Sequence, residues 1–188
     1  LCGLRLDPAT VTVVDVGGGS TELVRLGRAG RLERESLDIG CVRLTERHGI
    51  EAPARAEAIE AMEADIDSIL ARSAVRPLPP LVANSGTATA LAAIAGAVVP
   101  YDPGRIHGTT LQLDWLDGLV TRLASETLAQ RTDTPGLARE RADIIVAGAA
   151  ILSRVCRSAS ATALTISDHG VRHGLALEII ENFEIDPT

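Results

Sequence analysis

Residues 10–26 read TVTVVDVGGGSTELVRL, and this stretch decides the fold. Its first half is rich in β-branched residues and predicts a buried strand over Val11–Val16. Apolar and polar residues then alternate over Thr21–Leu26, which predicts a second strand. Three consecutive glycines, at positions 17–19, lie between the two runs. The stretch therefore predicts a β-hairpin with a glycine-rich turn.

The turn has the composition of a phosphate-binding loop. Residues without a Cβ allow positive φ, so successive backbone N–H groups can converge on an anion, and the Ser20 and Thr21 hydroxyls add donors. Asp15, at the end of the strand, can hold Mg²⁺ directly or through water, and the metal would bridge phosphoryl oxygens that the amides also hold. Glu22 is placed to organise the metal or its water shell. The predicted phosphate ligands of the loop are Gly17, Gly18, Gly19, Ser20 and Thr21.

An ordinary hairpin turn is the alternative interpretation of the same glycines. Two glycines between strands are a common connection. Such a turn requires neither the third glycine, nor Asp15 before it, nor the polar Ser-Thr-Glu run after it. The composition therefore favours a phosphate site.

The rest of the chain predicts an α/β fold with a mixed five-stranded sheet. Its strands are predicted at Val11–Val16, Thr21–Leu26, Leu32–Leu37, Leu81–Asn84 and Thr162–Ile166, with residues 27–30 as the second turn. The first three strands form an antiparallel meander, and crossover helices on the sheet connect the others. Helices are predicted at Cys41–His48, Pro53–Arg72, from Thr87, at Glu140–Arg157 and at Val171–Phe183.

A second candidate site is the strand-to-helix junction Ser85–Thr87. Small and hydroxyl residues there leave unsatisfied N–H groups at the positive end of a helix, which favours an anion. Ordinary capping of the helix by Ser or Thr explains the same residues. In a later helix, small residues around Gly148 predict close backbone packing. Whether Arg141 and Asp143 of that helix reach the cleft stays open.

A third candidate site follows the last strand, at Ser167–Gly170, where open α/β sheets gather ligands. His169 and His173 are four residues apart and suit one helix face, so they are a potential zinc pair. No third ligand lies nearby in the sequence and a glycine interrupts the turn, so a structural role is favoured. His107 is expected to order the loop Tyr101–Thr110 rather than to catalyse.

The composition predicts one domain over residues 1–188. Of the 188 residues, 46% are hydrophobic, which suits one sizeable core. Because the chain has one Phe, one Trp and one Tyr, that core must be aliphatic. The longest apolar run, Ala90–Val99, is about half of the roughly 20 residues that a membrane-spanning helix needs. A membrane partner is therefore not expected.

Cysteines and net charge indicate the surroundings of the chain. Cys2, Cys41 and Cys156 lie far apart without Cys-X-X-Cys spacing, which predicts free structural thiols and a cytoplasmic location. The formal net charge of −7 repels nucleic acid and other polyanions at long range. A phosphate ligand then needs local compensation from Mg²⁺, loop amides and arginines. Arg43 and Arg47 are candidates, and solvated surface side chains are the alternative.

The segment Asp15–Leu23 resembles the second phosphate loop of the Ppx/GppA family of exopolyphosphatases and guanosine pentaphosphate phosphohydrolases. This family belongs to the superfamily of actin, heat-shock chaperone ATPases and sugar kinases. Further segments resemble the family in the expected order: Ser36–Glu46, Ser85–Leu91, Tyr101–Pro103, Ile106–Gly108, Arg141–Gly148 and Ser167–Leu175. Several motifs in order are more specific than one glycine loop. Family members often carry Arg-Glu-Gly where this chain has Arg172-His173-Gly174, so a histidine stands in place of the glutamate.

The resemblance implies a ribonuclease H-like (actin-like ATPase) lobe of a Mg²⁺-dependent phosphohydrolase. The implied reaction releases terminal phosphate from inorganic polyphosphate or guanosine pentaphosphate. Asp15 and Glu22 are the implied catalytic residues, with Asp15 as the metal ligand. Arg43, Gly86 and Thr87 join the loop as implied phosphate ligands.

Family members carry an upstream lobe with a first phosphate loop and a Glu that positions water. Neither is found in this sequence, so it resembles the second lobe only, and we expect it to be inactive alone.

Two other functions stay open. An ATP-dependent kinase shares the fold and the phosphate loops, and a deep adenosine pocket beside Gly86 would favour it. A non-catalytic phosphate-sensing module would bind ligand without turnover, and the departure at His173 favours this alternative.

The partner of the terminal helix is open as well. In this superfamily the corresponding helix packs on the first lobe. Without that lobe its apolar side chains lack a partner, which favours a homodimer or a domain swap. These side chains are Leu175, Leu177, Ile179 and Ile180.

Overall fold

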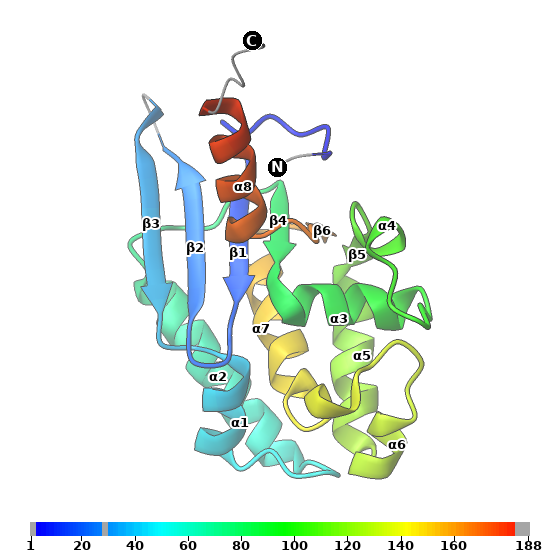
Figure 1. Ribbon diagram of the computed structural model, residues 1–188. Coiled ribbons are helices and arrows are strands. Elements are labelled where there is room, and N and C mark those ends of the chain that lie inside the picture. Colours follow the sequence, from blue (N-terminus) through cyan, green and yellow to red (C-terminus); the bar gives the residue numbers. More distant parts are fainter. Residues whose placement is uncertain (1–2, 28–29, 183–188) are drawn as a thin grey trace.

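A computed structural model of the chain describes residues 3–27 and 30–182. One mixed sheet of six strands runs through this part in the order β3-β2-β1-β4-β6-β5 (Figure 1). The strands are β1 Thr12–Val16, β2 Thr21–Leu26, β3 Leu32–Leu37, β4 Leu81–Asn84, β5 Thr110–Gln112 and β6 Ala163–Ile166. As predicted, β1, β2 and β3 form an antiparallel meander, which β4 and β6 extend in parallel.

The predicted number of five strands is wrong by one. The additional strand, β5, pairs antiparallel with β6 at the end of the sheet. It has three residues, and Leu111 is the buried one among them. Such a short strand shows too little alternation of apolar and polar residues to be recognised in the sequence. The α/β class and the mixed sheet are confirmed.

The described residues also form eight α-helices. They are α1 Cys41–His48, α2 Ala56–Arg72, α3 Ser85–Ala95, α4 Pro103–Ile106, α5 Leu113–Ser125, α6 Leu128–Thr132, α7 Ile145–Ser158 and α8 Val171–Asn182. In the view of Figure 1, α2 and α7 lie behind the sheet, whereas α8 stands in front of it. The predicted helix over Glu140–Arg157 is in fact two elements, a short 3-10 turn at Arg139–Arg141 and then α7.

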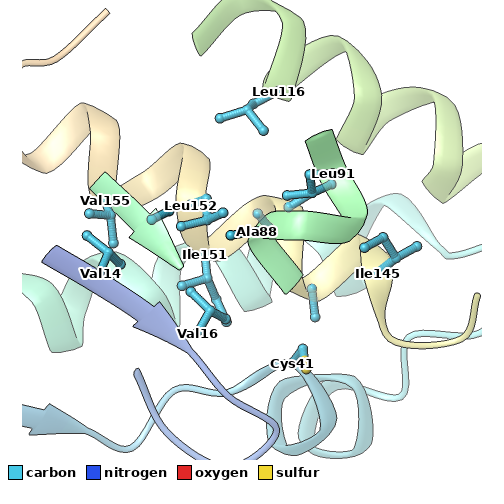
Figure 2. Close-up of a cluster of buried hydrophobic side chains, with 14 of the residues drawn as sticks. Val14, Val16, Cys41, Ala88, Leu91, Leu116, Ile145, Ile151, Leu152 and Val155 are labelled. Carbon is cyan, nitrogen blue, oxygen red and sulfur yellow. The ribbon is translucent and has the colours of Figure 1, made fainter. Parts of the chain in front are cut away.

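The core lies between the sheet and α7, which is buried along almost its whole length. Figure 2 shows Val16 of β1 beside Ile151 of α7. At Gly148 the Thr87 side chain of α3 packs directly on the backbone of α7, because a Cβ there would lie 2.5 Å from Thr87 Cγ2. The predictions of close packing at Gly148 and of an aliphatic core are confirmed.

A buried arginine, Arg131 of α6, was not recognised in the sequence. Its side chain is fully buried. Nε donates to the Leu123 carbonyl at 2.6 Å, and Nη2 donates to the Glu51 carbonyl at 3.0 Å. Burial lowers the pKa of the guanidinium, and the Glu126 carboxylate opposes that shift. The side chain thus ties α6 to the end of α5 and to the segment that follows α1.

We expect Arg131→Ala to destabilise the fold by about 2–3 kcal/mol, because it empties a buried site and removes the donor from two carbonyls. Urea unfolding measures this loss. Arg122→Ala is the matched control, since Arg122 forms a surface pair with Glu126 and such pairs contribute less than about 1 kcal/mol. Equal losses in the two variants would contradict the structural role of Arg131.

Some predictions fall outside the described residues. They concern Cys2, residues Arg28 and Ala29 of the second turn, and the helix end at Phe183. Cys41 and Cys156 are free and buried, as predicted. In the part of the chain that the structure describes, no helix is both long enough and apolar enough to cross a membrane.

Candidate functional site

In the glycine loop between β1 and β2, the carbonyls of Gly17 and Gly18 accept hydrogen bonds from α1, whereas most of the amides make no hydrogen bond among the described residues. Gly17 N donates to Ser20 O at 2.9 Å and closes the turn. The Gly17 carbonyl accepts from Cys41 N at 3.0 Å, and the Gly18 carbonyl accepts from the next two amides of α1. The amides of Gly18, Gly19 and Ser20 have no acceptor among the described residues. These three N–H groups are therefore available to an anion.

The glycines of the turn do not use their conformational freedom, and close packing requires glycine at the residue before α1 rather than in the turn itself. The three loop glycines keep φ outside the left-handed region, so the predicted positive φ is wrong. The closest approach is at Gly40, the residue before α1. A Cβ there would lie 2.5 Å from the carbonyl carbons of Gly18 and Gly19. Gly40 therefore lets the first amides of α1 reach the loop carbonyls.

A row of polar side chains crosses the sheet next to the loop. Asp15 of β1 faces Glu22 of β2 and Asn84 of β4. Glu22 in turn faces Ser36 of β3. Cross-strand partners share one face of a sheet, so the four side chains form a continuous row. The Ser20 and Ser36 hydroxyls each donate to Glu22 Oε1 at 2.7 Å. The fold thus places the two candidate catalytic carboxylates side by side.

The two carboxylates repel each other when both are ionised. Burial and the neighbouring Glu22 raise the pKa of the Asp15 carboxyl, and a hydrogen bond from the Ser85 hydroxyl opposes the shift. Asn84 is buried, and its Oδ1 atom has no hydrogen-bond partner among the described residues. A cation bound next to Asp15 would relieve the repulsion, because an opposite charge favours the ionised carboxylate.

The donor atoms of the row fit Mg²⁺. This ion takes oxygen ligands, and proteins hold it through one or two carboxylates together with waters and substrate phosphates. The described residues contain no group of three or more His, Cys, Asp or Glu side chains that suits a metal ion. The Asp15–Glu22 pair therefore suits an ion that shares its remaining positions with water and phosphate.

A cavity of about 600 Å³ opens at the start of α3. It is lined by Ser85, Gly86, Thr89, Asp168, Gly170, His173 and Ala176. Arg141 lies over Gly86, since a Cβ on Gly86 would lie 2.7 Å from the Arg141 Cζ atom. The guanidinium of Arg141 therefore lies against Gly86, one of the residues that line the cavity, whereas Asp143 acts on the buried Arg131. The cation of Arg141 and the N-terminus of α3 favour an anion at this place.

Thr21 and Thr87 have their hydroxyls in the interior. Thr21 Oγ1 donates to the Ile39 carbonyl at 2.6 Å. Thr87 Oγ1 donates to the Val16 carbonyl at 3.1 Å. Both residues are buried. Their hydroxyls are engaged with these carbonyls, and they hold the strands and α3 in place around the loop.

The two arginines selected from the sequence lie on α1. Arg43 Nε donates to the Gly19 carbonyl at 2.6 Å and so braces the loop. Arg47 Nη1 pairs with Asp65 of α2 at 2.6 Å. Arg43 therefore remains next to the loop, whereas Arg47 is engaged with another helix.

Three histidine rings stack next to the cavity. The ring centroids of His107 and His169 are 4.2 Å apart, and those of His169 and His173 are 3.8 Å apart with planes 3° from parallel. Nitrogen lone pairs of parallel stacked rings do not converge on one ion, so this arrangement does not suit tetrahedral zinc. The Tyr101 hydroxyl donates to Asp168 beside the stack. Burial and that hydrogen bond raise the pKa of Tyr101 to about 12.

Known proteins resemble this chain in both sequence and structure. The model of the Ppx/GppA phosphatase family matches residues 3–183. Exopolyphosphatase 2 of Mycobacterium tuberculosis is 34% identical over 180 residues, which cover 91% of this chain and 56% of that protein. A guanosine-5'-triphosphate,3'-diphosphate pyrophosphatase of Pseudoalteromonas atlantica is 28% identical over 176 residues, which cover 92% of this chain and 34% of that protein.

The fold agrees with these matches. The crystal structure of the Aquifex aeolicus Ppx/GppA phosphatase superposes with a TM-score of 0.84 at 30% identity, over 92% of this chain and 57% of that one. The chain thus spans about half the length of the curated exopolyphosphatases that it matches. Because the family match extends over almost all of its residues, the chain belongs to the Ppx/GppA phosphatase family.

Proposed function

We propose that this chain holds phosphate and Mg²⁺ in a phosphohydrolase that removes terminal phosphate from inorganic polyphosphate or guanosine pentaphosphate. The observation that carries the proposal is the Asp15–Glu22 pair next to the available amides of Gly18, Gly19 and Ser20. The relatives support both substrates, since they include exopolyphosphatases and a guanosine-5'-triphosphate,3'-diphosphate pyrophosphatase.

Each group has its own role in the proposed reaction. The loop amides donate to phosphoryl oxygens, and Asp15 and Glu22 hold the ion. The hydroxyls that donate to Glu22 Oε1 keep this carboxylate in place. When bound, Mg²⁺ neutralises charge that develops on the transferred phosphoryl group. Arg141 and the start of α3 bind the neighbouring phosphate from the other wall of the cleft.

The group that activates water belongs, in this proposal, to the part of the longer relatives that this chain does not span. We therefore expect the chain alone to bind its ligand without measurable turnover, because losing one general base costs about 10²–10⁴ in rate. A phosphate-release assay with polyphosphate measures this. Phosphate release by the chain alone would contradict this division of roles.

Calorimetric titration with inorganic tripolyphosphate tests the proposed binding site. We expect binding in the presence of Mg²⁺ and its loss when the metal is chelated, because the two carboxylates repel a polyanion that arrives without a cation. A chain that binds no tripolyphosphate with Mg²⁺ present would contradict the proposed function.

We expect Arg141→Ala to weaken tripolyphosphate binding about 10-fold, because a charge-assisted hydrogen bond contributes roughly 1.5–3 kcal/mol, part of which the neighbouring amides replace. The same titration measures the loss. Arg139→Ala is the matched control, since Arg139 lies in the same 3-10 turn and is exposed. An equal loss in both variants would indicate a general charge effect rather than a contact of Arg141.

One observation favours a nucleotide ligand, and with it the kinase alternative. This observation is the cavity of about 600 Å³ beside Gly86. Its lining residues offer hydroxyls, the Asp168 carboxylate and the His173 ring, but no large aliphatic side chain. We therefore expect ATP to bind no more tightly than tripolyphosphate. An ATP affinity that exceeds that of tripolyphosphate by 10-fold or more, roughly 1.4 kcal/mol, would favour the kinase instead.

The exposed face of α8 supports a proposal about partners. Leu175, Ile179 and Ile180 are 55%, 48% and 68% exposed, and Leu177 is half-buried. An exposed apolar face of this kind marks an interaction site. We propose that it meets the remaining part of the longer proteins, with a homodimer of this chain as the alternative. Sedimentation over a range of concentrations distinguishes a monomer from a dimer.

A further inference from the structure

Ser85 has an unusual backbone conformation for its place in the fold. It is the first residue of α3, and its φ is 85°. The other described non-glycine residues with positive φ are Ala97 and Ser160, which follow the ends of α3 and α7. Left-handed residues are common after a helix, where they cap its carbonyls. At the start of a helix no such cap is needed, so the strain at Ser85 requires another explanation.

The Ser85 hydroxyl connects the groups around the loop. Its Oγ donates to the Val16 carbonyl at 2.9 Å, and Val16 directly follows Asp15. Val16 ends β1 and directly precedes Gly17. Ser85 also lines the cavity at the start of α3. One side chain therefore binds the end of the strand that enters the loop, next to the candidate metal ligand, and also lines the ligand cavity.

A glycine would adopt the same φ without strain, but it has no hydroxyl to donate. We propose that Ser85 is a positioning residue, whose left-handed backbone directs the hydroxyl to the end of β1 and thereby fixes the Asp15 carboxyl and the glycine loop relative to α3. The expected effect of Ser85 on the binding of phosphate and Mg²⁺ rests on the proposed function. The geometric part concerns the loop itself and is tested separately.

The strain is tested by two variants that both lack the hydroxyl, Ser85→Gly and Ser85→Ala. They differ by the Cβ atom alone. In an ordinary helix the alanine variant is the more stable one. Here we expect the order to be reversed, with Ser85→Gly melting about 2–4 °C above Ser85→Ala. If Ser85→Gly melts no higher than Ser85→Ala, the strain assigned to Ser85 is wrong.

The positioning role is tested by the affinity of the same two variants for tripolyphosphate with Mg²⁺. We expect both to bind about 10-fold more weakly, as for other residues that orient a metal ligand. Ser160→Gly is the matched control, because it makes the same change at another positive φ, at the end of α7. It should bind as the unaltered chain does. A purely structural role would not weaken binding in Ser85→Gly, which is the relaxed variant. Unchanged affinity in both Ser85 variants would overturn the proposal.

Backbone amide resonances separate this inference from the proposed function. We expect the signals of Gly17, Gly18, Gly19 and Ser20 to shift in both Ser85 variants, without ligand, and to stay in place in Ser160→Gly. If the unaltered chain binds no tripolyphosphate, the proposed function fails, and the amide signals still decide the positioning role. Loop signals that do not respond to either Ser85 variant would overturn it.

Discussion

Replacing Asp15 by asparagine should abolish the Mg²⁺-dependent binding of tripolyphosphate, with a loss of affinity of at least about 100-fold, or 2.7 kcal/mol. Asp15 faces Glu22 across the hairpin and is next to the loop that carries the available amides. Without the Asp15 charge, one carboxylate is left to hold the ion, and an amide oxygen is a weaker ligand for a hard cation.

The stability of the same variant distinguishes a binding role from a structural one. Two adjacent carboxylates destabilise the fold in the absence of a cation, so Asp15→Asn should be at least as stable as the unaltered chain when no metal is present. Asp114→Asn, an identical change at an exposed position of α5, is the control for binding. A variant that binds tripolyphosphate normally, or that unfolds, would contradict the role given to Asp15.

The second large effect is expected at Gly40. Gly40→Ala should abolish tripolyphosphate binding and destabilise the fold by about 3–5 kcal/mol, because the new methyl group meets backbone atoms that no rotamer change can move. A Cβ at this position would lie 2.5 Å from the carbonyl carbons of Gly18 and Gly19. The expected response is a displacement of α1 and of the loop together. Calorimetry and urea unfolding measure the two losses.

Two other glycines provide matched controls for Gly40→Ala. Gly136 has φ of 87°, and a Cβ there would lie 2.8 Å from Ile94 N, at the far end of α3. Gly136→Ala should therefore lose stability but keep its affinity for tripolyphosphate. Gly118→Ala, in α5 with open space around it, should gain about 0.5–1 kcal/mol. If Gly136→Ala loses binding as well, the loss in Gly40→Ala reflects general instability rather than the loop.

Local patterns were sufficient to predict the elements next to the loop. The runs on either side of the glycines became β1 and β2, and both Leu32–Leu37 and Cys41–His48 have the bounds that the sequence predicted. These segments have clear periodicity and glycines at their ends. The strand β5 was missed because a strand of three residues is too short to show an alternation of apolar and polar side chains. The helix predicted over Glu140–Arg157 begins at Ile145, since the residues before it form a 3-10 turn.

Within the site, the sequence was sufficient to predict the neighbours that the β1–β2 hairpin alone brings together. Asp15 and Glu22 are brought together because their strands are adjacent and antiparallel. The positions of Asn84 and Arg141 depend on how β4 and the segment before α7 pack, which no local pattern shows. Thr87 illustrates the same limit, because it has the chemistry of a phosphate ligand but is buried where α3 meets α7.

The central claim is that the loop amides beside Asp15 and Glu22 hold phosphate together with Mg²⁺. Mapping backbone amide resonances during a titration with Mg²⁺ and tripolyphosphate tests it most directly. We predict that the largest shifts occur at Gly18, Gly19 and Ser20, with smaller ones at the start of α3, and that they vanish when the metal is chelated. Saturable shifts confined to another surface, or none at the loop, would contradict the account.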